Sequence, residues 1–391
     1  MPTPKLRFKD ENGQDFPEYS RNFITKLCSI KNGNINAEDG SDKGCYRFFD
    51  RGIESVKFAD SYFLDKEAII YAGEGSSFLP KYYFGKFALH QRCYALYDFH
   101  NSIAVEYVYQ YLLTKNSHFI RYAVGSTVKS LRLGSFNTCE VIIPCLDEQH
   151  KIAEFLSTVD EKVEVLEKKL EALNSLKKGF MQKIFSQELR FKDDSGQDFP
   201  EWECKELNNI AKSVNLKNTA GDILEPLTVS AEQGIVLQQD YFDRAITNEK
   251  NINGYTIVEK YDFIYNPRIS SLAKAGPIKL SKVKTGVVSP LYTVFRVKSS
   301  HKDSIEFLEH YFNSDAWVPY MQSVANYGAR SDRMSLKKQD FYALPVIFPC
   351  LEEQRKIAEF LSAFDEKIEA VKRQVEAMKQ VKKGLLQQMF V

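Results

Sequence analysis

Residues 144–185 are PCLDEQHKIAEFLSTVDEKVEVLEKKLEALNSLKKGFMQKIF, and residues 349–390 repeat them as PCLEEQRKIAEFLSAFDEKIEAVKRQVEAMKQVKKGLLQQMF. At a constant offset of 205, the two copies are identical at 23 of 42 positions, without a gap. Apolar residues recur in each copy at alternating steps of four and three, while Glu and Lys fill the other faces. This spacing predicts one long helix per copy, with a coiled-coil seam. The predicted seam consists of Ile152, Leu156, Val159, Val163, Leu166, Leu170, Leu173, Phe180 and Ile184, and of Ile357, Leu361, Phe364, Ile368, Val371, Val375, Met378, Leu385 and Met389.

One seam position in each copy holds a lysine, Lys177 or Lys382, and a glycine follows two residues later, Gly179 or Gly384. In one interpretation, the lysine extends its amine to solvent at a fraying helix end. In the other, it is a polar core position that fixes register and orientation, and the glycine lets a partner helix approach closely. The sequence leaves both interpretations open.

A second repeat precedes each variable stretch of the chain. Residues 6–18, LRFKDENGQDFPE, and residues 189–201, LRFKDDSGQDFPE, are identical at 11 of 13 positions. Their Asp, Gly and Pro content predicts an ordered connector with turns. The second connector follows directly on the first helix, whereas the first connector opens the chain, so joining the C-terminus to the N-terminus would recreate the same junction. The chain is therefore predicted to be a cyclic two-fold repeat whose termini lie close together.

The two variable stretches differ in sequence and length but keep one order of predicted elements. The first has β-rich runs at 67–73 and 93–99, a helix at 102–115 and a strand at 139–144. The second has β-rich runs at 260–266 and 286–297, a helix at 304–324 broken near Pro319, and a strand at 344–349. These patterns predict two domains of one α/β fold. The predicted division is a connector at 1–20, a first domain at 21–143, a helix at 144–188, a connector at 189–202, a second domain at 203–348 and a helix at 349–391.

The composition limits the classes of protein to which the chain can belong. With 391 residues, 43% of them apolar, it is long enough for two or three globular units. Its charges nearly balance, at 53 basic and 52 acidic residues, so binding to a polyanion requires local segregation of charge. Seven cysteines without a CxxC pair indicate neither a disulfide framework nor a metal site. Because no apolar run is long enough for a membrane span and the charged start does not fit a signal peptide, we expect a soluble cytoplasmic protein.

Long stretches without any acidic residue occupy equivalent places in the two domains. They are residues 75–97 and 107–139 in the first domain and 263–302 in the second, which also has a basic loop at 327–341. Their Lys and Arg residues are interleaved with aromatic residues, Ser, Asn and Gln. Lys and Arg neutralise phosphates, while Arg, Asn and Gln bind base edges. The windows therefore favour nucleic acid over a solvated basic face or a site for an acidic protein partner.

No catalytic site is visible in the sequence. Asn266, Pro267 and Arg268 superficially match the Asn-Pro-Pro-aromatic motif of amino-methyltransferases, but Arg268 replaces the second proline and no Gly-rich S-adenosylmethionine loop accompanies them. We interpret this segment as the end of a strand followed by a turn. The sequence has no GxxxxGK(S/T) phosphate loop, and its six histidines lack metal-ligand spacing. We therefore expect neither a cofactor nor a metal on this chain.

The motifs PCLDEQHKIAEFLSTVDEKV and PCLEEQRKIAEFLSAFDEKI, together with the two connectors, resemble the specificity subunit of type I restriction-modification enzymes over essentially the whole chain. The resemblance implies an α+β fold, in which two similar α/β target recognition domains are separated by a long antiparallel two-helix coiled coil with cyclic pseudo-two-fold symmetry. It also implies that the partners are double-stranded DNA and two modification subunits docked on the helices. S-adenosylmethionine would bind to the modification subunits and ATP to a restriction translocase subunit. Family members have no catalytic activity alone.

We expect the DNA contacts to lie in the acid-free windows and in the basic loop. The candidates in the first domain are Lys81, Lys86, Gln91, Arg92, Lys129, Ser130 and Arg132, and those in the second are Asn266, Arg268, Lys274, Lys282, Lys284, Arg330, Arg333 and Lys337. Ser130, Arg132 and Lys337 lie in a loop that matches at the 205 offset, and we expect them to hold phosphate. Arg330 and Arg333 lie outside that match, and we expect them to bind bases.

The resemblance and the repeat together predict a mechanism. A helix of about 36 residues is roughly 54 Å long, so the helix pair would set two half-sites about one turn of DNA or somewhat more apart. Because the two domains differ in sequence, the half-sites should be unrelated and the target asymmetric. Two other functions stay open, namely a coiled-coil scaffold whose domains bind proteins and a self-contained methyltransferase, although the missing motifs argue against the latter.

Overall fold

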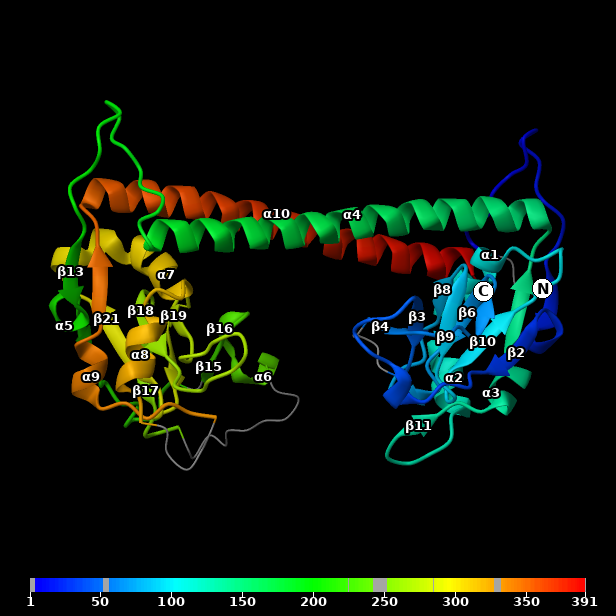
Figure 1. Cartoon of the computed structure of the whole chain (residues 1–391), viewed down its shortest axis with the longest axis horizontal. Coiled ribbons are helices and arrows are strands. Elements are labelled where there is room, and N and C mark those ends of the chain that lie inside the picture. The colour runs from blue at the N-terminus through cyan, green and yellow to red at the C-terminus, as the bar shows by residue number, and fades with distance from the viewer. Residues whose placement is uncertain are drawn as a thin grey trace. The chain divides into compact units, whose positions relative to one another are not determined.

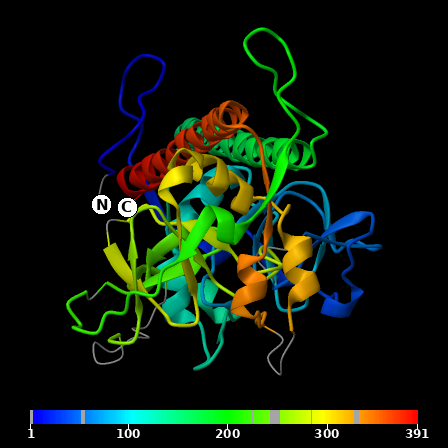
Figure 2. The same cartoon turned by 90° about the vertical axis from the view of Figure 1, so that its left-hand side faces the viewer.

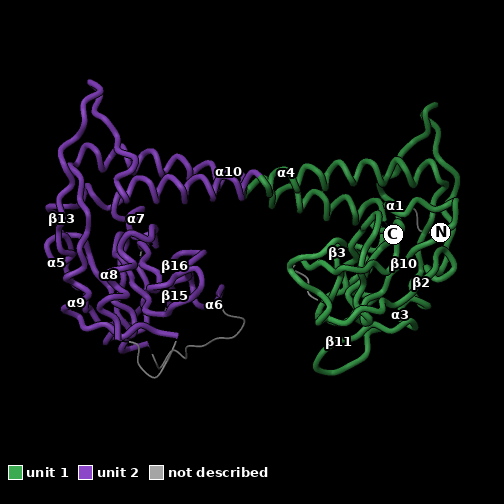
Figure 3. Tube along the Cα trace, in the orientation of Figure 1, with its two compact units in different colours: residues 1–168, 372–391 green, residues 169–371 purple. Residues whose placement is uncertain are grey.

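A computed structural model describes residues 4–51, 56–223, 225–241, 252–283, 285–326 and 332–390. The chain folds into two compact units (Figure 3). The first unit consists of residues 1–168 and 372–391, and the second of residues 169–371. Each unit thus contains one variable domain and part of both repeated helices. None of the described helices combines the length and the apolar character that a membrane span requires.

The described part of the first unit has two four-stranded sheets, two small ladders and several helices (Figure 1). The central sheet has the order β2 (Ser29–Asn32), β10 (Tyr94–Tyr97), β6 (Ala68–Tyr71), β8 (Lys81–Tyr83). The other sheet has the order β4 (Lys57–Ala59), β3 (Tyr46–Phe49), β9 (Lys86–Leu89), β5 (Leu64–Asp65). The ladders join β1 (Ser20–Phe23) to β12 (Glu140–Ile143) and β7 (Glu74–Gly75) to β11 (Lys129–Ser130). The helices are η1 (Ile24–Lys26), η2 (Ala37–Asp39), α1 (Val105–Leu113), α2 (Asn116–Tyr122), α3 (Leu133–Asn137) and the first part of α4 (Leu146–Phe185).

Alternate side chains of the central sheet face two different cores. Ile69 and Tyr71 of β6 pack in one core with helix α1, whereas Ala68 and Ile70 pack on the opposite face against β9. All four side chains are buried because both faces of the sheet are covered. A strand that is buried on both faces has a continuous apolar sequence rather than an alternating one, as the run at 67–73 does.

The second unit repeats the central sheet, whereas its other described strands pair only in two-stranded ladders. Its central sheet has the order β14 (Ala211–Ser213), β21 (Thr293–Val297), β18 (Asp262–Tyr265), β19 (Ile278–Leu280). Its ladders join β13 (Glu203–Glu206) to β22 (Pro345–Phe348), β15 (Leu227–Ser230) to β16 (Gly234–Leu237) and β17 (Thr256–Glu259) to β20 (Thr285–Val288). Its helices are α5 (Leu207–Ile210), α6 (Gln238–Tyr241), η4 (Ser299–Ser304), α7 (Ile305–Asn313), α8 (Val318–Val324), α9 (Lys338–Tyr342) and α10 (Leu351–Met389), of which α10 continues into the first unit.

The two central sheets have the same topology, which confirms that one fold is used twice. Strands β2, β10, β6 and β8 correspond to β14, β21, β18 and β19, and helices α1, α2 and α3 correspond to α7, α8 and α9. Two predicted elements are divided in the structure. A turn at Ser289 splits the run at 286–297 into β20 and β21. The predicted helix breaks between α7 and α8, just before Pro319, which occupies the first turn of α8 where its missing N–H costs nothing.

The repeated helices α4 and α10 pair in antiparallel fashion within the first unit. Asp160 and Glu167 on α4 form ion pairs with Lys382 and Lys379 on α10, so residue numbers rise along one helix as they fall along the other. The predicted seam residues are buried or half-buried in both units, whereas most of the helix positions beside them are exposed. The coiled-coil prediction is therefore confirmed.

The lysine in each seam forms an ion pair between the helices. Lys382 Nζ lies 2.5 Å from Asp160 Oδ1 in the first unit, and Lys177 Nζ lies 2.5 Å from Asp365 Oδ1 in the second. The two pairs are equivalent at the 205 offset, and the lysine side chains are only 17% and 14% exposed. The structure therefore supports a polar position that fixes register. The glycine two residues later has open space around it in both copies, so close helix approach does not explain it.

Helix α7 adds a histidine to the ion pair of the second unit. His310 is buried, and its Nδ1 lies 3.9 Å from Asp365 Oδ2. Burial and, next, the nearby Lys177 ammonium lower the pKa of His310 to about 4. In the first unit, the corresponding helix α1 carries Gln110, whose Nε2 donates to Asp160 Oδ2 at 2.8 Å. The equivalent aspartates of the two units are therefore contacted by different side chains, a histidine in the second unit and a glutamine in the first.

We expect His310 to make the second unit less stable as the pH falls from about 6.5 toward 4. An unfolded histidine binds its proton near pH 6.5, whereas buried His310 does so near pH 4. The unfolded state therefore binds more protons in this window, and the free energy of unfolding drops by about 2 kcal/mol at pH 5. His310→Gln copies Gln110 and should remove this part of the pH dependence. Denaturant unfolding of both proteins at pH 7 and pH 5 measures the effect, and an equal loss in the two would contradict it.

Each connector is fixed to the start of a repeated helix by a buried carboxylate. Glu148 in the first turn of α4 accepts two hydrogen bonds from Arg7, at 2.7 and 3.1 Å. Glu353 in the first turn of α10 accepts two from Arg190, at 2.8 and 2.9 Å. The aromatic residue that ends each connector donates a third hydrogen bond. Both carboxylates have no exposed side-chain surface, so the arginines neutralise charges that water cannot reach.

The end of α10 and the first connector reproduce the junction between α4 and the second connector. Leu6 N donates to the Gln388 carbonyl oxygen at 3.1 Å, and Leu189 N donates to the Lys183 carbonyl oxygen at 2.9 Å. Lys183 and Gln388 are equivalent at the 205 offset. The two ends of the chain therefore meet within the first unit, which confirms the prediction of a cyclic repeat.

Candidate nucleic-acid interface

A two-stranded ribbon extends the central sheet of the first unit beyond the end of β6. Strand β7 pairs with β11, and Leu131 N donates to the Gly73 carbonyl oxygen at 2.8 Å. Residues 73–75 and 129–131 are called ribbon 1. Within the first unit, β11 lies at the end of the domain remote from α4, as Figures 1 and 2 show. Ribbon 1 is thus presented away from the helices.

Ribbon 1 carries a cluster of charged side chains around Glu74. Glu74 Oε2 accepts a hydrogen bond from Arg51 Nη1 at 2.7 Å, and Arg92 pairs with the other carboxylate oxygen. These two guanidinium groups, Arg51 foremost, lower the pKa of Glu74. Gly73 permits the arrangement, because a Cβ atom there would lie 1.7 Å from the Arg92 carbonyl oxygen. One carboxylate therefore holds two partly exposed arginines at the ribbon, and Lys129 lies on its other strand.

Residues 267–270 and 332–335 form ribbon 2 at the equivalent end of the second unit. Backbone hydrogen bonds of 3.0 Å join its two segments. Arg268 Nη2 lies 3.3 Å from Asp332 Oδ2, and Arg333 lies opposite Arg268 in the ladder. The charges of the two ribbons are arranged differently. In ribbon 1, the acidic residue Glu74 lies on the segment that follows β6, whereas in ribbon 2 the acidic residue Asp332 lies on the segment that does not follow β18. The two ribbons thus share a backbone but present different side chains.

A short helix follows each ribbon and begins at a cationic residue. Arg132 is the N-cap residue of α3, and Lys337 is the N-cap residue of α9. Both side chains belong to exposed residues, and the two positions match at the 205 offset. Ser130 lies two residues before Arg132, on β11. The loop that the sequence predicts to be common to both domains is therefore one structural feature in the two units.

The structure brings some of the predicted contact residues together and separates others. Arg92, Lys129, Ser130 and Arg132 lie in or beside ribbon 1, and Arg268, Arg333 and Lys337 lie in or beside ribbon 2. Lys81 and Lys86 lie instead on strands β8 and β9, and Lys282 lies beyond β19, where its Nζ is 2.8 Å from Glu309 Oε1. Gln91 and Lys274 are exposed in turns. Lys284 and Arg330 lie outside the described residues.

Asn266 is buried and joins β18 to ribbon 2. Its Nδ2 donates to the Val229 carbonyl oxygen at 3.1 Å, and its Oδ1 accepts a hydrogen bond from Arg268 N at 3.0 Å. The sequence predicts a strand end followed by a turn here; β18 does end at Tyr265, but residues 267–270 continue as one segment of ribbon 2, and the turn comes later, at 270–273. Both ends of the amide thus have protein partners, which hold Asn266 in place beside ribbon 2, and its predicted DNA contact stays a prediction.

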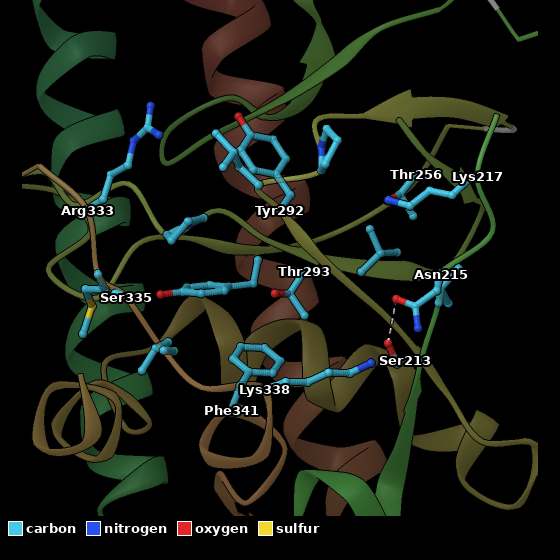
Figure 4. Close-up of a pocket in the computed structure, with 18 residues that line it drawn as sticks. Ser213, Asn215, Lys217, Thr256, Tyr292, Thr293, Arg333, Ser335, Lys338 and Phe341 are labelled. Atoms are coloured by element: carbon cyan, nitrogen blue, oxygen red, sulfur yellow. Dashed lines mark hydrogen bonds between the residues drawn. The ribbon is translucent and has the colours of Figure 1, made fainter. Parts of the chain in front are cut away.

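An open pocket of about 580 Å³ adjoins ribbon 2 in the second unit (Figure 4). Its lining combines aromatic rings, hydroxyl groups and cations, and none of the lining residues that the structure describes is acidic. The rings are those of Tyr265, Tyr292 and Phe341, and the cations are Lys217, Arg333 and Lys338. Arg333 thus belongs both to the pocket and to the ribbon.

Sequence-based prediction misses three of the cations at these surfaces. Arg51 has acidic neighbours in the sequence, and Lys217 lies outside the acid-free windows. Lys338 lies beside the predicted Lys337 but has no basic counterpart at the 205 offset, where residue 133 is a leucine. The Lys-Lys pair at 337–338 is the signal that could have identified it.

A family model described as the type I restriction modification DNA specificity domain matches residues 19–175 and again residues 200–380. The chain belongs to this family. The double match corresponds to the two domains with equivalent sheets, ribbons and helices, so this is a specificity subunit with the two-domain, two-helix fold that the sequence predicts.

Known specificity subunits resemble the chain over different lengths. It is 31% identical over 163 residues to the EcoDI specificity subunit of Escherichia coli, which is 42% of this chain and 36% of that subunit. It is 22% identical over 294 residues to the MjaVIII specificity subunit of Methanocaldococcus jannaschii, which is 72% of this chain and 68% of that subunit.

Two solved structures share the fold of this specificity subunit. The S subunit of a type I restriction-modification system from M. genitalium matches 100% of this chain and 99% of its own at 18% identity, with a TM-score of 0.60. A chain solved in work on complex assembly and conformational transition of the type I R-M system matches 96% and 98% at 12% identity, with a TM-score of 0.50.

Proposed function

We propose that this specificity subunit recognises a two-part target in double-stranded DNA and has no catalytic site of its own. Each domain would bind one half of the target through its ribbon and the loops beside it. The two repeated helices would set the spacing of the halves and bind two modification subunits. The subunit would act in the cytoplasm, where its DNA is.

The recurrence of one ribbon at the same place in two divergent domains is the observation that carries this proposal. Both ribbons extend the central sheet beyond the same strand end, and both are followed by a short helix with a cationic N-cap residue. Arg92 and Arg268 are 57% and 60% exposed, so the fold does not need these side chains in its core. Exposed cations and hydrogen-bonding groups on an extended ribbon fit the phosphates and base edges of DNA.

The differences between the ribbons support an asymmetric target. Ribbon 1 presents two arginines that share Glu74, whereas ribbon 2 presents Arg268 beside Asp332 and adds Arg333. Different side chains at equivalent places should bind different bases, so the two half-sites should be unrelated. The pseudo-two-fold relation between the domains would place the half-sites on opposite strands.

The lengths of the repeated helices suit a spacer. Helix α4 has 40 residues and α10 has 39. Because each residue of an α-helix adds 1.5 Å, each helix is roughly 60 Å long. A spacer of this length allows half-sites separated by about one turn of DNA or somewhat more.

The partner subunits supply the chemistry in this proposal. S-adenosylmethionine would bind to the modification subunits, and ATP would bind to a restriction translocase subunit of the full complex. Apolar side chains exposed at equivalent positions of the two helices suit the docking of two like subunits. Leu176 on α4 is 53% exposed and Val381 on α10 is 50% exposed, and the two match at the 205 offset.

DNA footprinting of this chain in complex with its modification subunits tests the proposal. We expect protection of a two-part site that the modification subunits alone do not protect. The protection should weaken steeply between about 50 and 200 mM salt, because phosphate contacts release counterions. Protection no stronger than that given by the modification subunits alone would favour the coiled-coil scaffold whose domains bind proteins. Binding of S-adenosylmethionine to this chain alone would indicate a methyltransferase.

A further inference from the structure

The registers of the two central sheets place Thr293 where the first unit has a tyrosine. Tyr94 of β10 pairs with Tyr71, the last residue of β6. Thr293 of β21 pairs with Tyr265, the last residue of β18. Because β10 corresponds to β21 and β6 to β18, Tyr94 and Thr293 are equivalent. A large side chain of the first unit is therefore replaced by a small one in the second.

A second replacement lies beside the first. Ile30 of β2 pairs with Leu96, two residues after Tyr94. Ser213 of β14 pairs with Phe295, two residues after the equivalent threonine. Ser213 therefore lies where the first unit has Ile30. In both replacements, the second unit has a smaller side chain that carries a hydroxyl.

In the first unit, Tyr94 fills the space against α3. Tyr94 is 5% exposed, its ring centroid lies 5.1 Å from that of Phe136, and its hydroxyl donates to the Leu131 carbonyl oxygen at 3.3 Å. Phe136 and Leu131 correspond at the 205 offset to Phe341 and Leu336, which both line the pocket of the second unit. The pocket therefore includes the volume that a tyrosine ring fills in the first unit. The threonine that leaves this volume open is particular to the second domain.

The inner wall of the pocket offers flat apolar surface together with hydrogen-bonding groups. Tyr265 and Phe341 stack with ring centroids 5.1 Å apart and are each 2% exposed, so the half-buried Tyr292 supplies the more accessible ring of the lining. Thr293, Asn215 and Ser335 also line the pocket and add hydroxyl and amide groups. The volume of about 580 Å³ lies within the range of small-molecule sites, roughly 300–1,000 Å³. The wall thus suits a planar ligand with polar edges.

Two lysines give the pocket an uncompensated positive charge. Lys217 Nζ donates to Thr256 Oγ1 at 3.0 Å, and Lys338 Nζ lies 5.9 Å from the centroid of the Tyr342 ring. Both lysines are exposed, and neither forms an ion pair with a carboxylate among the described residues. In Figure 4, the Lys338 side chain extends toward Ser213. A pocket whose described lining has cations and no acidic residue favours an anionic ligand.

We propose that this pocket binds a nucleotide, with the base beside the Tyr292 ring and the phosphate at Lys338. Part of the inference rests on the proposed function, because in the DNA-bound subunit the nucleotide would be one that is unstacked from the half-site of the second domain. Aromatic side chains bind unstacked bases in this way, and extrusion of a base is a known route to its recognition. A free mononucleotide has the same chemistry and would bind to the same groups.

Filling the pocket tests the inference on the full chain. Thr293→Tyr introduces the ring that the first unit has as Tyr94, and it should lower the affinity for dAMP, dCMP, dGMP or dTMP at least 10-fold in ligand-observed NMR. Thr293→Val keeps the size of the side chain and should keep the affinity within about twofold. Lys338→Gln leaves the pocket open and should weaken binding several-fold. Thermal unfolding of each variant checks that it folds. If Thr293→Tyr does not fold, the binding measured for Lys338→Gln still tests the inference. Inorganic phosphate, which has no base, measures the binding that charge alone provides.

A second experiment identifies the source of the nucleotide. Duplexes that carry 2-aminopurine at successive positions of the half-site bound by the second domain are mixed with the full chain and its modification subunits. A rise in emission at one position, lost in Thr293→Tyr, would support an unstacked nucleotide of the target. Binding of free mononucleotides without any such rise would support a free nucleotide as the ligand. If neither probe binds, or only phosphate binds, the inference is overturned, while footprinting of a two-part site would still uphold the proposed function.

Discussion

Replacing Arg333 by alanine should reduce discrimination in one half of the DNA target about 10- to 100-fold and leave the other half unchanged. Arg333 lies on ribbon 2, is half-buried, and forms no ion pair with a carboxylate among the described residues. A guanidinium in this situation can donate two hydrogen bonds to a guanine, which contributes about 1–3 kcal/mol against the wrong base. Methylation by the complex of targets with single-base changes measures the effect at every position of both halves.

Lys337→Ala is the matched control for Arg333→Ala. Lys337 is the exposed N-cap residue of α9, at a position where both domains have a cation, so we expect it to hold phosphate. Its loss should weaken binding to all targets alike and reduce the salt dependence by about one phosphate contact. If Arg333→Ala behaves in the same way as Lys337→Ala, then Arg333 is a phosphate contact and does not determine specificity.

Replacing Arg190 by alanine should lower the free energy of unfolding of the second unit by about 3–5 kcal/mol. Arg190 donates two hydrogen bonds to Glu353, whose side chain has no exposed surface, and Trp202 Nε1 donates a third at 2.7 Å. Without the guanidinium, a carboxylate charge would remain buried with a single hydrogen bond, which is far more costly than the loss of a surface ion pair. Denaturant unfolding of the two proteins measures the difference.

Two further variants identify the origin of that loss. Adding Glu353→Gln to Arg190→Ala removes the buried charge and should recover part of the stability, because a neutral amide costs less to bury. Arg7→Ala should cause a similar loss in the first unit, where Arg7 bonds Glu148 in the same geometry. A loss below about 1 kcal/mol for Arg190→Ala, as surface ion pairs show, would refute the account of the connector.

The features that the sequence predicts correctly are local or repeated. The helix seam follows from spacing within one segment, and the cyclic repeat follows from two copies of connector and helix. The role of Lys177 could not be predicted, because its partner Asp365 lies on the other helix and only the pairing of the helices brings the two charges together. The same limit applies to Glu74, which meets Arg51 and Arg92 only after the sheets form.

The ribbons and the pocket could not be predicted for a related reason. Ribbon 1 pairs Glu74 with Ser130, which are far apart in the chain, and no local pattern predicts this contact. The equivalence of Tyr94 and Thr293 appears only when strands are matched by their register, because the variable domains share too little sequence to align. The acid-free windows were nevertheless informative, since they contain Arg92, Lys129 and Arg268.

Sequencing of methylated bases in cells that contain this chain and its modification subunit tests the central claim most directly. We expect a single target in two parts, with unrelated bases in the two halves and a fixed number of unspecified base pairs between them. Exchange of residues 21–143 for the first domain of another specificity subunit should change one half and leave the other half and the spacing intact. A continuous or palindromic target, or one whose spacing varies, would contradict the claim that two DNA-binding domains are held at a set distance by the paired helices.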